Sequence, residues 1–316
     1  MVRLTRKTFI GWKAEATEGT DASLGNSDHY LAEDVEITYE SDETERRSNL
    51  GDLTQLAPIT GGIVARATWT TEIYGSGSAG TAPDHGDLFQ ACGLEEVVSA
   101  GVSVAYQYSS ATADHDTVSL YIWKDGLRHK ILGARGTATL RFEAGMLGKV
   151  DWDFVGQYEG DPAEATNPAP TYSTTSPPSA LGTTFTVDST SLVGRTLDLS
   201  LDNANASRRS FSATHGYEVP KLADRLGSGN LTIEAPTLAT LNAINKWRTK
   251  DVMDGSFVLG SSAGNILTVG WKMAFNVPSF SDQEGIANYD IPFQLTADPA
   301  STTAYDEEDV LVLTYT

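Results

Sequence analysis

The sequence predicts a mainly β protein made of two tandem β-sandwich or barrel-like domains, each with one short flanking helix. Three observations lead to this fold class. Apolar residues alternate with polar ones over short runs, related segments recur in the two halves of the chain, and a proline-rich stretch separates these halves. The chain has 316 residues, which is enough for two domains of ordinary size.

The predicted strands are short runs with a period of two, which places alternate side chains on opposite faces of a sheet. Val35, Ile37 and Tyr39, for example, are separated by polar residues. The same alternation occurs at residues 197–202, 68–73, 151–154 and 288–291. Residues 121–123 and 127–132 flank the hairpin signal Lys124-Asp125-Gly126, and residues 310–316 predict a final strand.

Each half also contains one predicted short helix. In the first half, Pro83 precedes an apolar group that ends at Gly93. In the second half, Pro236-Thr237 opens a run in which every third residue is apolar, so these residues would share one helix face. The apolar positions of that face are Leu238, Leu241, Ile244 and Trp247. We therefore expect each sheet to be covered by one helix.

The two halves resemble each other in sequence. Residues 35–48 (VEITYESDETERRS) align with residues 197–210 (LDLSLDNANASRRS), and the same shift of 162 positions aligns 70–72 with 232–234. Residues 151–157 resemble 288–294 with a shift of 137, which predicts an insertion in the first copy at about 95–116. We predict a first domain at 1–160, a Pro/Ser/Thr-rich linker at 161–184 and a second domain at 185–316.

The chain is strongly acidic, with 22 Lys and Arg against 42 Asp and Glu and a formal net charge of −20. This charge disfavours binding to nucleic acid or to an anionic membrane as the main function. No window approaches 18 consecutive apolar residues, and the first residues lack the apolar region of a secretory signal, so we expect synthesis in a cytoplasm. The acidity either serves solubility alone or makes one surface repel a polyanion.

The polar positions of the predicted strands recur in both copies. One interpretation is an ordinary solvated sheet face. The other is a lumen wall that faces DNA without binding it, because carboxylates repel phosphates. The predicted lumen-lining residues are Glu36, Thr38, Glu40, Thr70, Glu72, Asp151, Asp153, Asp198, Ser200, Asp202, Thr232, Glu234 and Asp290.

An arginine pair follows the first strand of each copy, within the long polar stretches 41–60 and 203–227. These pairs are Arg46-Arg47 and Arg208-Arg209. We interpret them as inter-subunit contact loops that could form bidentate pairs with carboxylates of a neighbour. Solvated loops are the alternative.

No motif indicates catalysis, a cofactor or a metal site. Gly260-Ser261-Ser262-Ala263-Gly264 fits the nucleophile-elbow spacing but lies between two strand-like runs, which predicts a hairpin turn. The pairs Asp28-His29, Asp84-His85 and Asp114-His115 could ligate a metal, but their polar surroundings favour solvated loops. Cys92 is the only cysteine and is expected to be a buried, inert thiol. We therefore predict that the protein is not an enzyme.

The run GSGSAGTAPDHGDLFQACGLEE at 75–96 resembles a segment of the tail tube proteins, or major tail proteins, of long flexible-tailed bacteriophages. In that family a Gly/Ala-rich loop leads through an acidic proline dipeptide, here Pro83-Asp84, to a short helix. The helix residues that match are Leu88, Phe89, Ala91, Cys92 and Gly93. The runs 35–53 and 311–316 are also similar to this family.

This resemblance implies a structural virion protein of the phage tail, made in the bacterial host cytoplasm, whose β-sandwich domains join into stacked rings. The implied lumen is a negatively lined conduit for DNA ejection, and DNA passes without specific binding. Because two domains occur in one chain, a trimeric ring with pseudo-sixfold symmetry is favoured. A hexameric ring, with the second domain decorating the exterior, is the alternative. The implied partners are adjacent rings, the tape measure protein and the tail tip and terminator proteins.

Two other classes of function remain open at this point. A two-domain module that binds carbohydrate or a cell surface would need an exposed aromatic platform, for which Tyr121 and Trp123 are candidates. Strand alternation also explains both residues as core. A hydrolase using Ser262 or an Asp–His metal site is the least favoured class.

Overall fold

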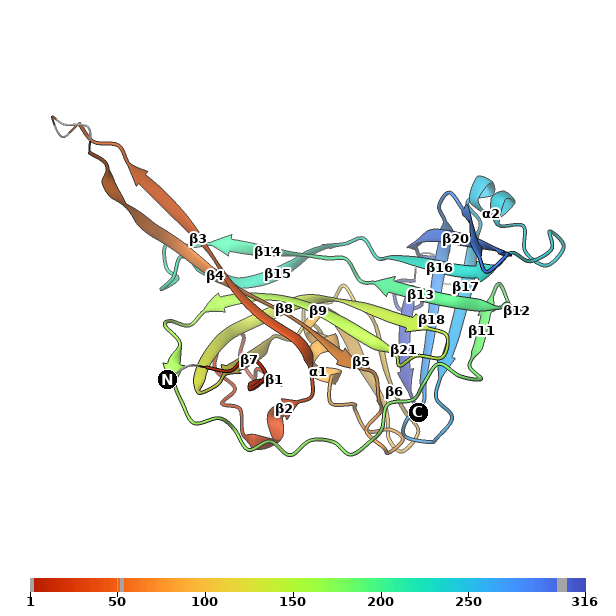
Figure 1. The fold of residues 1–316 in the computed structure, drawn as a ribbon, viewed down its shortest axis with the longest axis horizontal. Helices are drawn as coiled ribbons and strands as arrows, with labels where there is room; N and C mark the ends of the chain where they lie inside the picture. The colour runs from red at the N-terminus through yellow and green to blue at the C-terminus, as the bar shows by residue number, and fades with distance from the viewer. Residues whose placement is uncertain (1–2, 50, 52–53, 300–305) are drawn as a thin grey trace.

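The structure is a computed structural model that describes residues 3–49, 51, 54–299 and 306–316. Strands dominate this part of the chain, as the sequence predicts (Figure 1). The first half contains β1 (Thr8–Ala14), β2 (His29–Tyr30), β3 (Glu33–Arg46), β4 (Leu56–Glu72), β5 (Leu94–Ser99), β6 (Ser103–Tyr108), β7 (Val118–Lys124), β8 (Leu127–Glu143), β9 (Lys149–Tyr158) and β10 (Ala163–Glu164). The second half contains β11 (Thr184–Val187), β12 (Thr190–Ser191), β13 (Gly194–Ser200), β14 (Asn203–Arg209), β15 (Tyr217–Arg225), β16 (Ser228–Glu234), β17 (Val252–Leu259), β18 (Leu267–Phe275), β19 (Ser279–Gln283), β20 (Ile286–Leu295) and β21 (Leu311–Tyr315). The helices are η1 (Asn26–Asp28), α1 (Gly86–Ala91) and α2 (Ala243–Thr249).

One antiparallel sheet passes through both halves of the chain. Its order is β3-β4-β9-β8-β13-β16-β20-β19, and we call it the joined sheet. The halves meet at the β8–β13 ladder, where Leu140 lies opposite Leu199 and Arg141 opposite Asp198. The main-chain hydrogen bonds therefore continue from one half to the other without a free edge between them.

A second layer lies behind the joined sheet and gives each half the character of a β-sandwich. In the first half β1 pairs with β2 and β7, and β7 pairs with the first part of β8. In the second half β11 pairs with β12 and β17, and β17 pairs with β18. The C-terminal strand β21 pairs with β18 on one side and with β6 on the other, so this layer also connects the halves.

The two halves have the same strand order. In the first half β3-β4-β9-β8-β7-β1 are neighbours in turn, and in the second half β13-β16-β20-β18-β17-β11 are. The registers also agree at a shift of 162, because Glu36 lies opposite Thr68 and Asp198 lies opposite Asn230. The two-domain division itself stays a prediction.

The structure corrects the alignment of the last repeated segment. Asp151 lies opposite Thr70, and Asp290 lies opposite Thr232. Asp151 therefore corresponds to Asp290, a shift of 139 rather than the 137 predicted from the letters alone. The short sequence match is ambiguous by one strand period of two residues, which only the cross-strand pairing resolves.

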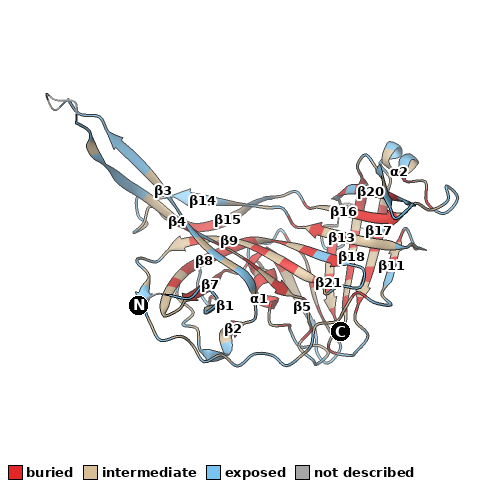
Figure 2. Cartoon of the chain, viewed as in Figure 1, coloured by how far each residue is buried: buried red, intermediate tan, exposed pale blue. Residues whose placement is uncertain are grey.

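The core lies between the two layers and is made of buried apolar residues from both halves. Buried positions lie on the strands of the sandwich, whereas the far parts of β3 and β4 are mostly exposed (Figure 2). In the first half the rings of Trp12, Trp69 and Trp152 form a stack with centroid distances of 6.0 and 6.4 Å. Helix α1 packs against this stack through Phe89, whose ring is 5.1 Å from that of Trp152. In the second half the buried Trp271 stacks on Phe293.

Several predicted elements differ in extent from the structure. Helix α2 begins only at Ala243, because the Asn242 side chain accepts a hydrogen bond from the Asn245 backbone and caps the helix there. Leu238 thus lies before the helix and is 67% exposed. The predicted insertion at 95–116 contains most of the β5–β6 hairpin, to which β21 adds. The hairpin at Lys124-Asp125-Gly126 is confirmed, with positive φ at Asp125 and Gly126.

The predicted polar loops at 41–60 and 203–227 are largely hairpin arms. β3 and β4 extend well beyond the sandwich and form a projecting arm, while β14 and β15 form a second arm that lies across the first half (Figure 1). The predicted linker is a long strap with little regular structure. It is held by pairing of β10 with β8 and by a bridge between Leu147 and Ser179.

The β8–β13 contact generates a prediction about stability. Leu199 is fully buried opposite Leu140, so Leu199→Ala should lower the free energy of unfolding by about 2–5 kcal/mol in urea denaturation of the monomeric protein. Ile37 is the equivalent residue at the shift of 162 and is only half-buried, so Ile37→Ala should cost much less. Equal costs would contradict this account of the contact.

Candidate functional site

The strands of the joined sheet bring the predicted lumen-lining residues onto one face. We call this surface the polar face. β3 carries Glu36, Thr38 and Glu40 on it, and the remaining strands supply the others in alternation with buried residues. These others are Thr70 and Glu72 on β4, Asp151 and Asp153 on β9, Asp198 and Ser200 on β13, Thr232 and Glu234 on β16, and Asp290 on β20. Asp202 lies just beyond β13, at a bend where its φ is 45°.

Hydroxyl–carboxylate hydrogen bonds link neighbouring strands across the polar face. Thr70 Oγ1 donates to Asp151 Oδ1 at 2.7 Å, and Thr232 Oγ1 donates to Asp290 Oδ1 at 2.8 Å. These two contacts occupy equivalent positions in the two halves. Ser228 donates to Asp202 in the same way. Each carboxylate is thereby held at a fixed position on the sheet.

Basic side chains, which the sequence reasoning missed, partly neutralise the polar face. Arg141 Nη2 lies 2.6 Å from Asp151 Oδ2, and Lys149 Nζ lies 2.5 Å from Glu33 Oε2. Arg66 forms a two-pronged pair with Asp153, and Arg195 lies 3.4 Å from Glu234. Strand alternation could have identified these residues, because residues an even number of positions apart lie on the same face of a strand. Arg66 lies on the same face of β4 as Thr70, and Lys149 lies on the same face of β9 as Asp151. Carboxylates still outnumber the basic groups, so the face remains acidic.

Asp198 lies at the junction of the two halves and has a perturbed acidity. Burial, the largest effect, raises the pKa of its carboxyl, and nearby Asp151 raises it further, while Arg141 opposes both. Burial has the largest effect because Asp198 lies in the middle of the joined sheet, where strands on both sides exclude water from its carboxyl.

The predicted contact arginines lie on strands or at strand ends rather than in loops. Arg209 pairs at 2.6 Å with Asp42 of the first half, so it joins the two arms within one chain. Arg208 donates to the Val219 carbonyl across its own hairpin. Arg47 pairs with its neighbour Glu45, and Arg46 is exposed at the end of β3. A role in contacts between subunits stays a prediction.

The histidines of the three Asp–His pairs are not solvated, contrary to the sequence interpretation, whereas Asp28, Asp84 and Asp114 are partly exposed. His29, His85 and His115 are all buried. His85 Nε2 lies 2.6 Å from the Tyr315 hydroxyl, and burial lowers the pKa of His85 to about 3, so this ring packs as a neutral core residue. The prediction failed because burial depends on packing against segments far away in the chain, as the C-terminal strand packs against His85, and polar neighbours in sequence do not indicate such packing.

The described part of the chain contains no cluster of three or more His, Cys, Asp or Glu side chains suited to a metal. The run Gly260–Gly264 connects β17 to β18 as a hairpin, as predicted. Cys92 is buried, also as predicted, and burial raises the pKa of its thiol. No helix within the described ranges is long and apolar enough to span a membrane.

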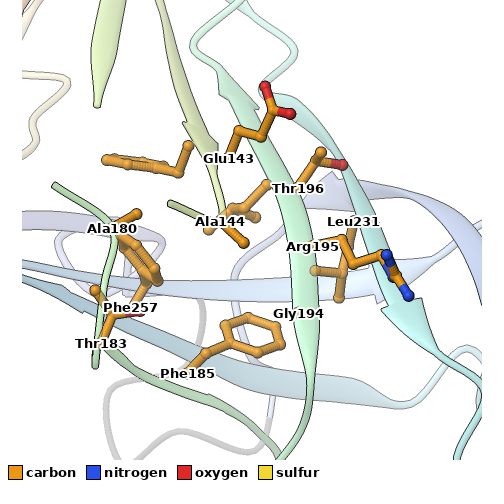
Figure 3. Close-up of a pocket in the computed structure, with 12 residues that line it drawn as sticks. Glu143, Ala144, Ala180, Thr183, Phe185, Gly194, Arg195, Thr196, Leu231 and Phe257 are labelled. Atoms are coloured by element: carbon orange, nitrogen blue, oxygen red, sulfur yellow. The ribbon is translucent and has the colours of Figure 1, made fainter. Parts of the chain in front are cut away.

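The cavity beside the β8–β13 junction has no room for a small-molecule ligand. A cavity of about 50 Å³ lies beside the β8–β13 junction, with the rings of Phe185 and Phe257 against it (Figure 3). Ligand pockets usually measure about 300–1,000 Å³, so this space is too small for one. Tyr121 and Trp123 are 3% and 5% exposed and cannot form the aromatic platform of a carbohydrate-binding module.

The acidity of Asp198 leads to a pH-dependent prediction. Its folded-state pKa lies above the ordinary value of 3.8, so ionisation of this carboxyl disfavours the folded state at neutral pH. Asp198→Asn should therefore raise the Tm at pH 7. The gain should disappear as the pH falls through the folded-state pKa, because the native side chain is then neutral as well. Circular dichroism melts between pH 3 and 7 measure this.

The matched control for this prediction is Asp151→Asn. Asp151 accepts the Thr70 hydrogen bond and the Arg141 ion pair, so its replacement should lower the Tm at pH 7. A lower Tm for Asp198→Asn at neutral pH would contradict the account given for Asp198.

Comparison with known protein families supports the resemblance noted in the sequence. The model of the phage tail tube protein family matches residues 5–298, which is nearly the whole chain. No individual curated protein gives a significant match. The match extends through both halves and includes every strand of the joined sheet. The chain therefore belongs to the phage tail tube protein family.

Proposed function

We propose that this protein is the structural subunit of a phage tail tube, that it polymerises into stacked rings, and that its polar face lines the lumen through which DNA is ejected. The observation that carries the proposal is the joined sheet. It has one buried face and one face with repeated, mostly acidic polar positions. Membership of a tail tube family favours this structural role over catalysis.

An acidic lumen would let DNA slide. Phosphates and carboxylates repel each other, so no part of the lumen wall would hold the duplex. This repulsion acts on the phosphate backbone and is therefore the same for every DNA sequence. Ion pairs with basic side chains weaken the repulsion of DNA and offset the repulsion between neighbouring carboxylates of the sheet. These side chains are Arg66, Arg141, Lys149 and Arg195.

A trimeric ring suits the dimensions of the joined sheet. Each copy contributes the eight strands of the joined sheet, so three copies would close a barrel of 24 strands. Ordinary strand spacing and tilt give such a barrel a diameter of about 45–50 Å between strand axes, which leaves room for a DNA duplex inside the side chains. Further partners would be adjacent rings, the tape measure protein, and the tail tip and terminator proteins.

Negative-stain electron microscopy of the purified protein tests assembly directly. We expect rings or tubes with a central hole at high protein concentration or in the presence of a tail tip. Material that stays monomeric under all these conditions would contradict the proposal.

Charge reversal on the polar face tests the role of the lumen. Glu72→Lys combined with Glu234→Lys should leave the tube assembled but slow DNA ejection, because added cations would hold phosphates. Infectivity of assembled phage and release of DNA in vitro measure this effect. Glu159→Lys with Glu308→Lys makes the same change of charge at exposed positions outside the polar face and should have little effect. Unchanged ejection in the first variant would argue against the lumen assignment.

A further inference from the structure

The joined sheet ends in two strand edges, β3 and β19. Within the described residues, β3 pairs only with β4, and β19 pairs only with β20. Open edges with free main-chain donors and acceptors favour pairing with another chain. The question is which partner fits them, and the internal repeat of the chain answers it.

β19 occupies the position in the second half that the end of β8 occupies in the first. Asp151 of β9 lies opposite Thr139 of β8, and the equivalent Asp290 of β20 lies opposite Ser279 of β19. Residues 139–143 of β8 therefore correspond to 279–283 of β19. The outer edge of 139–143 is the one that pairs with β13, and β13 is the counterpart of the start of β3.

From this equivalence we infer that β19 of one copy pairs with β3 of the next copy in the register of the β8–β13 ladder. The inference rests on the proposed function, and it specifies the surface by which ring subunits join. Shifting the β8–β13 pairs by 140 and 162 positions gives the expected partners. They are Ser279 with Thr38, Phe280 with Ile37, Ser281 with Glu36, Asp282 with Val35, and Gln283 with Asp34.

Burial differs between the two junctions as this pairing requires. Leu140 and Leu199 meet at the closed junction and are both 0% exposed. Their counterparts at the open edges are Phe280, which is 65% exposed, and Ile37, which is half-buried. The apolar residues are thus present at the open edges and lack only the cover that a second copy would supply.

The space beside the closed β8–β13 junction is filled, whereas the equivalent space beside the open β3 edge is not. The 50 Å³ cavity at the closed junction is lined in part by Gly194, Thr196 and Leu197 (Figure 3). The counterparts of these residues at the shift of 162 are Ala32, Asp34 and Val35, and they line an open groove of about 770 Å³ beside β3. At the closed junction the end of β8 fills the equivalent space.

Charge and hydrogen bonding also fit β19 as the occupant of this groove. The groove is lined by Arg3, Arg6 and Lys124 and by the acidic Asp34 and Glu36, so its basic groups are in excess. The pairing would bring the acidic Asp282 and the following Glu284 towards this groove. On the polar face, the Ser281 hydroxyl of β19 is buried without a hydrogen-bond partner among the described residues. The pairing places it opposite Glu36, which would repeat the hydroxyl–carboxylate contacts seen elsewhere on the polar face.

Cysteine cross-linking tests the register. Glu36→Cys with Ser281→Cys in one chain should give intermolecular disulfides under mild oxidation, and the covalent ladder should end at trimers. The two positions cannot bond within one chain, because seven strand spacings separate β3 from β19, or about 34 Å along the sheet. An equimolar mixture of the two single variants should give dimers only. Native Cys92 is buried and does not compete.

Two control variants make the result specific. Asp198→Cys with Arg141→Cys is the equivalent pair at the closed junction and should form a disulfide within the monomer. Glu36→Cys with Gln283→Cys is displaced by one strand period, and such diagonal pairs lie about 7–8 Å apart, beyond the usual reach of a disulfide. Preferential cross-linking of this displaced pair would overturn the inferred register.

A second substitution tests the edge without cysteine chemistry. Phe280→Asp should abolish the assembly of subunits into rings. It should leave the Tm of the isolated subunit nearly unchanged, because the Phe280 side chain is largely exposed there. Leu140→Asp, at the buried equivalent position, should unfold the subunit.

The outcomes separate this inference from the proposed function. Rings that form without the Glu36–Ser281 cross-link, or that persist in Phe280→Asp, would overturn the edge pairing and leave the tube function standing. Absence of rings in the native protein would overturn both.

Discussion

Continuous main-chain hydrogen bonding across the β8–β13 ladder is the constraint on which the rest of the structure depends. A sandwich made from either half alone would leave long strand edges, and an unpaired edge has backbone groups that must find a partner or stay in water. The chain removes one pair of edges by joining its halves at Thr139–Glu143 and Thr196–Ser200. The C-terminal strand does the same in the second layer, where β21 lies between β18 and β6.

This joining also determines the electrostatics of the protein. Because strand side chains alternate, one continuous sheet with a buried face must present a continuous opposite face. The chain fills that face with carboxylates and fixes them with threonine, serine and arginine partners on neighbouring strands. Part of the net charge of −20 is therefore organised on one surface. The raised pKa of Asp198 shows that this organisation has a local cost where the halves meet.

The two hairpin arms show how equivalent segments can have different surroundings. The β14–β15 arm lies across the first half, where the Tyr217 hydroxyl donates to Asp42 Oδ2 at 2.8 Å and Lys221 pairs with Glu18. Its counterpart, the β3–β4 arm, projects away from the sandwich (Figure 1). The same contrast separates buried Leu199 from half-buried Ile37. Within one chain, β3 and the β3–β4 arm of the first copy thus have covered equivalents in the second copy.

The fold class, most strands and the shared polar positions follow from the amino-acid sequence alone. These depend on local periodicity, since a period of two places Glu36 and Asp198 on the side of a strand opposite to Val35 and Leu197 wherever that strand lies. The buried Cys92 and the hairpin at Asp125-Gly126 were also predictable, because each depends on a few adjacent residues.

The choice of neighbouring strands, in contrast, depends on packing between distant parts of the chain. The basic partners Arg66 and Arg141, the burial of His85 against Tyr315, and the shift of 139 between Asp151 and Asp290 all depend on contacts between residues far apart in the chain. Local patterns contain no information about such pairings. A slip of one strand period preserves every alternation in the sequence while changing every partner across the sheet.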